Sequence, residues 1–214
     1  MKNKVLVLFV ILLSLTACQK YGVRGNGNLT TETRSIENFT AIEAGGIFRV
    51  YVEIGESASL KIEAEENLMS YIKAKVKGST LVLDLKKNIN PKEHVTVYVT
   101  TPDLERVESS GASKIYVENI DSDYFKLDLS GAGKVKLVGK TDRFIADISG
   151  AANLDAFDLK CEDVDIDMSG ASKAEIYCDG ILKTDISGVG KVVYDGNPKN
   201  VYSEISGLGK ITSR

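Results

Sequence analysis

The sequence predicts an all-β protein that folds as a right-handed parallel β-helix, in which successive turns of the chain stack on one another. Two observations predict this fold class. Ser-Gly followed by Ala, Val or Leu recurs six times at steps of 18 to 20 residues, and apolar residues alternate with polar ones around each copy. Alternation with a period of two indicates strands, and a constant repeat length is typical of stacked units that bury each other's apolar faces.

The six repeats align residue by residue. Positions one and three before each serine, and five and seven after it, are mostly apolar and share one face of an extended chain. Six strands spaced ~4.8 Å apart give a column roughly 24 Å tall, and parallel crossovers are almost always right-handed. An antiparallel sandwich also alternates, but it does not need the same residue at equivalent positions. The serines are Ser110, Ser130, Ser149, Ser169, Ser187 and Ser206.

A glycine follows each of these serines. Such glycines are expected to allow a tight bend or a close approach of two backbones. The stretch around Gly133 and Lys134 also resembles a phosphate-binding loop, but Asp128 occupies the required first glycine position and Val135 follows the lysine. We therefore interpret the repeat as architecture. The repeat glycines are Gly111, Gly131, Gly150, Gly170, Gly188 and Gly207.

The N-terminal sequence predicts that the protein is exported and that a lipid is attached to it. Residues 1–17 read as a signal peptide, with Lys2 and Lys4 before the apolar run Val5–Leu15. The run ends in Leu-Thr-Ala-Cys, which resembles a lipoprotein lipobox, so Cys18 is the expected lipidation site. No later apolar run approaches 18 residues, so we expect a chain attached to the outer membrane without crossing it. Whether it faces the surface or the periplasm stays open.

The first half of the mature chain is less regular. Residues 18–38 are polar and predict a tether, residues 39–104 predict irregular rungs or a cap, and residues 105–214 hold the regular rungs, all in one body. Strands are expected over Ile47–Ile54, "SLKIEAE" and "HVTVYVT", a helical turn over Glu66–Ile72, and a hairpin about Lys77-Gly78. A cap is expected because an open end would expose unpaired strand edges.

Composition narrows the function classes. Without Lys2 and Lys4 the mature chain has 25 basic and 30 acidic residues, a balance of −5, which argues against nucleic acid as a partner. Cys161 and Cys178 are spaced unlike zinc ligands. They should lie on adjacent rungs, either bridged by a disulfide or as two buried thiols. No metal site is predicted.

Two files of like charge face outward. The first alternative is that the chain bends between the two files, so that they face each other and form a zipper, meaning a row of ion pairs. The second alternative is a solvated charged face, and the third is a site for Ca²⁺. Like charges ~5 Å apart repel by about 0.8 kcal/mol per neighbouring pair even in water, so an offsetting interaction is expected. The acidic file is Glu108, Asp128, Asp147, Asp167, Asp185 and Glu204, and the basic file is Lys114, Lys134, Lys173, Lys191 and Lys210.

The lipobox, "FTAIEAGGIFRVYV", "ENLMSYIKAKVKGSTLVLDL" and the serial Ser-Gly rungs together resemble the auto-transporter adhesin head domain, or GIN domain, of Bacteroidetes lipoproteins. The resemblance covers about Ile36 to Ile211. It implies a right-handed β-helix and a role in adhesion, and it brings no catalytic residues.

We therefore expect a membrane-anchored, adhesin-like binding or display module with a glycan or an envelope protein as partner. The alternatives are a structural envelope protein and, in last place, a carbohydrate-active enzyme. Such enzymes need a local pair of carboxylates, whereas here the carboxylates are spread one per rung. No catalytic residue and no cofactor are predicted, and the oligomeric state is left open.

Overall fold

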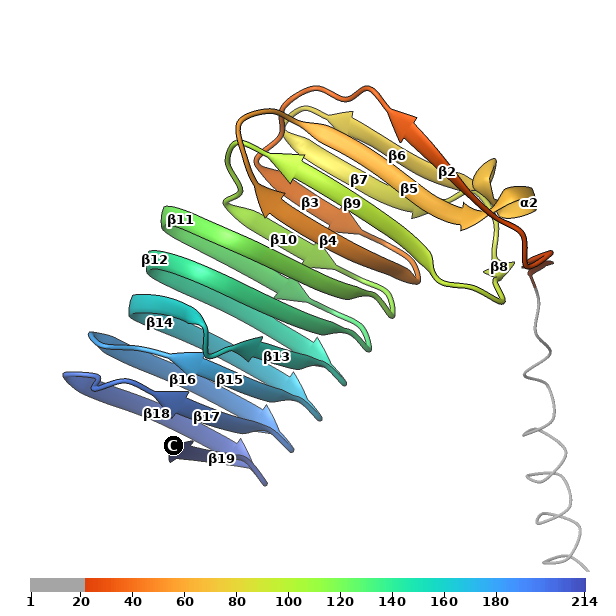
Figure 1. Ribbon diagram of the computed structural model, residues 1–214. Helices are drawn as coiled ribbons and strands as arrows, with labels where there is room; N and C mark the ends of the chain where they lie inside the picture. Colours follow the sequence, from red (N-terminus) through yellow and green to blue (C-terminus); the bar gives the residue numbers. More distant parts are fainter. Residues whose placement is uncertain (1–21) are drawn as a thin grey trace, which may run out of the picture.

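The computed structural model describes residues 22–214 and confirms a parallel β-solenoid with a less regular N-terminal part. Figure 1 shows the turns stacked one below another, from β11 (Lys114–Leu129) in green to β19 (Lys210–Ser213) in blue at the C-terminus. The N-terminal strands, orange to yellow, close the opposite end of the stack.

Each regular turn contains two strand segments separated by a bend at the Ser-Gly unit. Every segment pairs in parallel with its equivalent one turn away. The strands are β10 (Arg106–Ser109), β11 (Lys114–Leu129), β12 (Lys134–Gly150), β13 (Asn153–Ala156), β14 (Leu159–Gly170), β15 (Lys173–Tyr177), β16 (Ile181–Gly188), β17 (Lys191–Asp195), β18 (Asn200–Gly207) and β19 (Lys210–Ser213).

The register of these pairings confirms the predicted vertical files. Ser149 lies opposite Ser169, which lies opposite Ser187, which lies opposite Ser206. Each step is one turn of the solenoid, with no slip along this file. A parallel ladder in register places every residue on its own counterpart, as the equal repeat lengths predicted.

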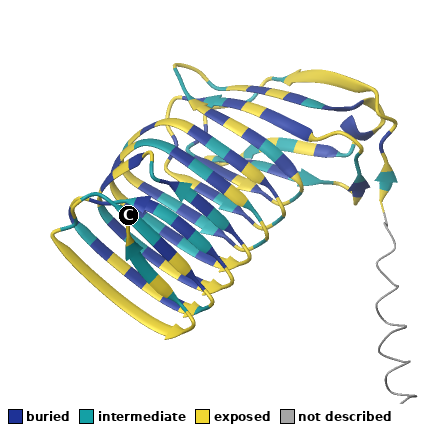
Figure 2. Ribbon diagram, turned by 60° about the horizontal axis from the view of Figure 1, so that its bottom comes forward, coloured by how far each residue is buried: buried dark blue, intermediate teal, exposed yellow. Residues whose placement is uncertain are grey.

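The apolar core fills the inside of the coil. Leu129, Ile148 and Ile186, which each directly precede a repeat serine, are at most 2% exposed, whereas Ile205 in the last turn is 43% exposed. Figure 2 shows the resulting alternation of buried and exposed positions along the strands. Phe125 and Phe144 occupy neighbouring turns with ring centroids 6.3 Å apart, a favourable separation for an aromatic pair.

The repeat glycines leave room for the backbone of the preceding turn. A Cβ atom on Gly170 would lie 2.5 Å from the carbonyl oxygen of Gly150, and one on Gly188 would lie 2.6 Å from that of Gly170. Real Cβ atoms do not approach backbone oxygens so closely. Gly170 also has a φ of +105°, a region that side-chain-bearing residues rarely adopt. The close backbone approach predicted for these glycines is therefore present.

The N-terminal half adds one more turn to the stack. β3 (Ala41–Ala44) pairs in register with β10, and β4 (Phe48–Ile54) with the start of β11. Gly46 takes the place of a repeat glycine, because its backbone fills the space that a Cβ atom on Gly111 would need. The N-terminal half therefore contains a rung, as predicted, and this rung has the same backbone contact between glycines as the regular rungs.

Beyond this turn, antiparallel strands cover the end of the parallel stack. β7 (Thr80–Leu85) and β9 (Val95–Thr101) continue the parallel pairing on β3 and β4. β6 then pairs antiparallel with β7, and β5 with β9. The β6–β7 hairpin and the helical turn α2 lie where the sequence predicted them. The bounds are β5 (Ser59–Glu65), α2 (Glu66–Met69), β6 (Ile72–Lys77), β1 (Val23–Arg24) and β8 (Ile89–Asn90), the last two paired in parallel.

The described part of the predicted tether is folded, which corrects the assignment of residues 18–38. All of β2 (Leu29–Arg34) pairs antiparallel with β5, over Leu60–Glu65. The buried carboxylate of Glu65 accepts hydrogen bonds from the backbone amides of Gly27, Lys92 and Glu93. The sequence hid this strand because β2 is an exposed edge without apolar alternation.

We predict that Gly170→Ala lowers the free energy of unfolding by about 2–4 kcal/mol, through steric conflict with Gly150 and an unfavourable φ. Gly78→Ala is the matched control, because Gly78 also has a positive φ (+60°) but has open space around its Cβ position. The control should lose only about 1 kcal/mol. Urea denaturation followed by circular dichroism measures both. Equal losses would show that the contact between glycines does not constrain the fold.

Candidate functional site

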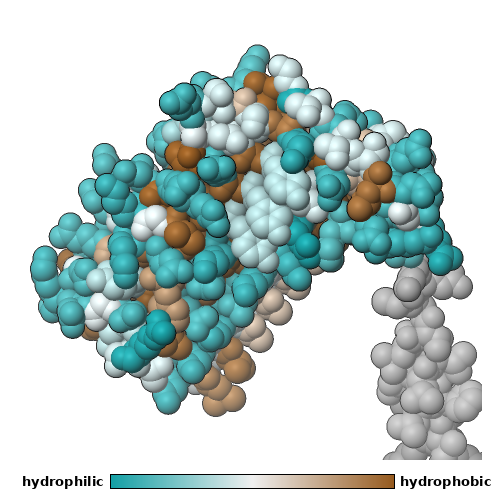
Figure 3. Space-filling view, viewed as in Figure 1, coloured by the Kyte–Doolittle hydropathy of each residue, from teal (hydrophilic) through white to brown (hydrophobic). Residues whose placement is uncertain are grey.

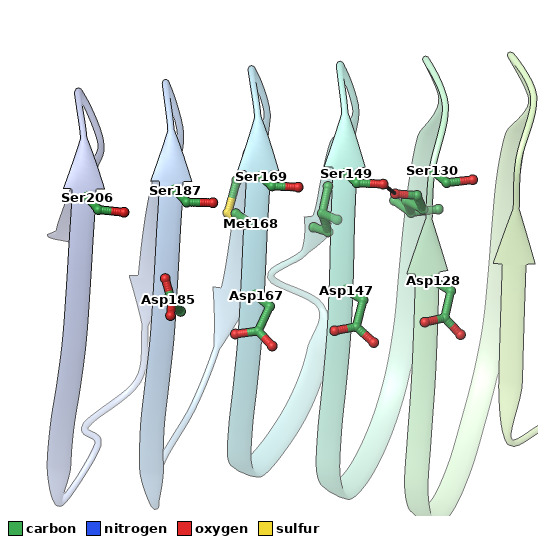
Figure 4. Close-up of a pocket in the computed structure, with 12 residues that line it drawn as sticks. Asp128, Ser130, Asp147, Ser149, Asp167, Met168, Ser169, Asp185, Ser187 and Ser206 are labelled. Atoms are coloured by element: carbon green, nitrogen blue, oxygen red, sulfur yellow. Dashed lines mark hydrogen bonds between the residues drawn. The ribbon is translucent and has the colours of Figure 1, made fainter.

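The acidic file and the serine file line one open groove on the solenoid. The groove has a volume of about 540 Å³ and includes Asp128, Asp147, Asp167 and Asp185 together with the serines that follow them. Figure 4 shows these carboxylates and hydroxyls in two parallel rows, one residue of each kind per turn. Each serine follows its aspartate by two positions, so both point to the same outer face of the strand.

The acidic file extends further than the sequence indicated. Glu43 of β3 lies in register with Glu108, which continues into the aspartates. The basic file likewise continues from Lys114 to Arg49 of β4. The repeat signal is weak in the N-terminal half, so the sequence did not reveal these two additional members.

Lys126 partly compensates the acidic file. Its Nζ lies 3.2 Å from the Asp128 carboxylate and 3.1 Å from that of Asp147, so one lysine bridges two turns. Hydrogen bonds to Asp147 and then Asp128 raise the pKa of Lys126. The sequence reasoning missed this lysine because its file is not basic throughout: the next turns carry Ile145 and Asp165 at the same position.

Farther along the groove the carboxylates are not compensated in this way. Asp167 forms no ion pair within residues 22–214. Partial burial, and then the neighbouring carboxylates of Asp147, Asp165 and Asp185, raise its pKa. Partial burial also raises the pKa of Asp128, although Lys126 opposes the shift. The groove therefore offers hydrogen-bond acceptors and hydroxyls at the spacing of the turns.

The structure does not form the zipper that was the first interpretation of the charged files. In the described part of the chain, no ion pair joins the acidic file to the basic file. Lys173 instead pairs with Glu175, two residues along its own strand, at 2.7 Å. The chain does bend between the two files, but it bends around the core, so side chains on the outside of the bend diverge.

A solvated charged face describes both files better than the zipper does. Most lysines of the basic file are exposed, and exposed ion pairs contribute little to stability. Among the described residues, no group of three or more His, Cys, Asp or Glu side chains is arranged to hold a metal ion. Successive carboxylates lie on separate turns, and their spacing gives no reason to prefer Ca²⁺ over water.

Cys161 and Cys178 lie on adjacent turns, as the repeat length predicted. The hydrogen bond from the amide of Asp179 to the carbonyl oxygen of Cys161, at 3.1 Å, shows this placement. Both are free, buried thiols in the structure. Each donates to a backbone carbonyl instead of bonding to the other, Cys161 to Leu159 and Cys178 to Glu162. Burial raises the pKa of both thiols, which makes them poor nucleophiles. The disulfide stays a prediction.

The predicted signal peptide and the lipidation site Cys18 lie outside the described residues. The part of the chain that the structure describes contains no helix with the length and apolar character needed to cross a bilayer.

A parallel β-solenoid with repeated polar files along its outer faces defines the structural class of this chain. Within that class, the family described as "Putative auto-transporter adhesin, head GIN domain" matches residues 38–198, which are 161 of the 214 residues. The chain belongs to this family. No protein among the curated ones is similar to it in sequence at a significant level.

Solved structures of similar fold come from Bacteroides and Parabacteroides species. A putative adhesin from Bacteroides fragilis NCTC 9343 is 22% identical, with a TM-score of 0.74 over 90% of this chain and 100% of that one. A putative adhesin from Parabacteroides merdae ATCC 43184 is 21% identical, with a TM-score of 0.56 over 90% and 99%. A putative lipid binding protein from Parabacteroides distasonis ATCC 8503 is 18% identical, with a TM-score of 0.55 over 90% and 99%. These likenesses concern the fold.

We predict that Asp167→Asn raises the Tm at pH 7 by about 1–2 °C, a small gain because solvent screens the site. Since the folded pKa of Asp167 is raised, ionisation disfavours the native state above the unfolded pKa, and this penalty disappears when both states are protonated. The gain should therefore vanish near about pH 3. Glu56→Gln, in the exposed loop between β4 and β5, is the control and should leave the Tm unchanged. A gain that persists at low pH would contradict the electrostatic explanation.

Proposed function

We propose that the protein is a lipid-anchored, adhesin-like binding module of the cell envelope, which presents its outer faces to a partner with a regular repeat. The observation that carries this proposal is the groove in which a hydroxyl and a carboxylate recur on every turn. A rigid parallel stack holds these groups at a fixed spacing of ~4.8 Å. Membership of an adhesin family supports the same function.

Binding is favoured over catalysis because the same carboxylate and hydroxyl recur on successive turns, and these turns differ in the pairing of Lys126 with Asp128 and Asp147. Catalysis by paired carboxylates requires two groups in different environments at a set separation. Here Asp147, Asp167 and Asp185 occupy equivalent positions on successive strands. Such an arrangement suits many equal, weak contacts along an extended partner. A structural envelope protein without a specific ligand is the competing function.

The proposed anchor is the lipid on Cys18. The folded body begins close after it, since β1 starts at Val23. The antiparallel strands at this end of the stack would then lie nearest the membrane, and the regular turns would extend away from it. The anchor would hold the protein in the envelope. Whether the protein faces the cell surface or the periplasm stays open.

Adhesion can be tested with the unlipidated chain, meaning residues 18–214 with Cys18→Ser. Beads coated with it should be retained on surfaces coated with bacterial cell envelopes, and soluble unlipidated chain should compete for retention. Beads coated with serum albumin are the control. Retention no greater than that of the albumin beads would favour the structural alternative and contradict a binding function.

Lipid attachment can be tested in the full-length protein expressed in a Gram-negative host. We predict that the wild-type chain fractionates with membranes and that Cys18→Ser moves it to the soluble fraction, because the described body has no helix that could cross the bilayer. Ser14→Ala, inside the signal peptide, is the control and should stay membrane-bound. A Cys18→Ser protein that remains in the membrane fraction would refute the anchor.

A further inference from the structure

Three tyrosines from distant parts of the sequence form a stacked file on the outside of the N-terminal turns. Tyr98 of β9, Tyr51 of β4 and Tyr116 of β11 lie in register across three neighbouring strands. Their ring centroids are 5.5 Å and 5.0 Å apart, with interplanar angles of 14° and 13°. We call these three residues the tyrosine file.

The stacked rings remain partly open to solvent. Rings in full face-to-face contact would be separated by only about 3.5–4 Å, and the centroid distances of 5.0 and 5.5 Å are longer than that. Tyr51 has a ring on either side and is still 37% exposed, about the same as Tyr98 at 36%. Figure 3 shows a pale patch at the centre of this face, in the region where β4 and β9 lie in Figure 1.

The surroundings of the tyrosine file are polar. It lies in an open depression of about 390 Å³ that also contains Glu53, Glu118, Ser59 and Thr100. Glu53 lies in register with Glu118 on one side and Thr100 on the other. Among residues 22–214 neither glutamate forms an ion pair, so both carboxylates are free to accept hydrogen bonds.

One end of the file is covered by a cation. The Nζ of Lys61 lies 4.3 Å from the centroid of the Tyr98 ring, within the range of a cation–π contact. Beyond Tyr116 at the other end, the same outward position carries Lys136 and then Asp155. The file therefore leads from a closed end onto a polar track that runs along the solenoid.

We propose that the tyrosine file binds a glycan, an extended chain of pyranose rings lying across β9, β4 and β11. This inference rests on the proposed adhesin-like function and names the class of its ligand. A pyranose ring presents C–H groups on its faces and hydroxyls around its edge. The exposed parts of the tyrosine rings can pack against the former, while Glu53, Glu118 and Thr100 bind the latter.

The spacing and the charge both favour this ligand. An extended β-1,4-linked chain repeats its sugar ring at nearly the distance that separates the tyrosine centroids, so successive sugars can meet successive tyrosines. Single-stranded nucleic acid also stacks on aromatic side chains, but it needs a basic groove. Here Lys61 and Lys136 at the ends of the file are balanced by Glu53 and Glu118, so the site is not a basic groove, and its carboxylates accept hydrogen bonds from hydroxyls.

The test is isothermal titration of the unlipidated chain with cellohexaose and chitohexaose, which are β-1,4-linked, and with maltohexaose, whose α-1,4 linkages curl the chain. We expect at least one β-1,4 hexasaccharide to bind more tightly than maltohexaose. Tyr51→Ala should weaken that binding at least tenfold, because it removes the central ring. Tyr51→Phe keeps the ring and should bind within a factor of about two to three of the wild type.

Tyr202→Ala is the control for loss of an exposed tyrosine, because Tyr202 is 57% exposed and lies at the far end of the solenoid on β18. It should leave binding unchanged, and a thermal melt of each variant verifies folding. If no hexasaccharide binds, or if Tyr51→Ala binds like the wild type, the glycan site is refuted. In that case, beads that still adhere to periodate-treated envelopes would show that adhesion persists without intact glycans, so the adhesin function would hold although the glycan site had failed.

Discussion

The carbonyl oxygen of one glycine occupies the space in which the next turn would place a side chain. This contact recurs from Gly46 through Gly111 and along the repeat glycines to Gly207. Because only glycine tolerates it, the contact permits one vertical alignment of the bends, and that alignment sets the register of the strands on either side. The straight files of the core, the serines and the charged residues all follow from it.

Strict register has both a cost and a use. It places like charges on top of one another, as at Asp147 and Asp167, and Lys126 offsets only part of that repulsion. The same register brings Tyr51 and Tyr98 into a stack although they are far apart in the sequence. In a solenoid, a side chain that recurs in every turn forms a continuous row along the outer face, and all groups in that row have the same chemical character. Such rows suit an extended partner with its own repeat.

The sequence predicted the features that depend on the repeat, and it failed where the repeat is interrupted. The parallel stack, the inward core and the glycine contact follow from equal spacing and shared parity. β2 was missed because a polar edge strand such as Leu29–Arg34 has no alternation to detect. The tyrosine file was missed because its members come from three strands of unlike sequence. The zipper was wrong because the chain bends around the core, so outward side chains on the two sides of the bend diverge; the spacing of residues in the sequence does not give the direction of a bend.

The most direct test of the stacked register is a pair of spin-label distances along the basic file, measured by double electron–electron resonance. Labels at Lys114 and Lys191 are four turns apart and labels at Lys114 and Lys210 five turns apart. The account predicts distances of about 19 Å and about 24 Å, an increase of ~4.8 Å for one added turn. Equal distances for the two pairs, or a decrease from the first to the second, would contradict a parallel in-register stack.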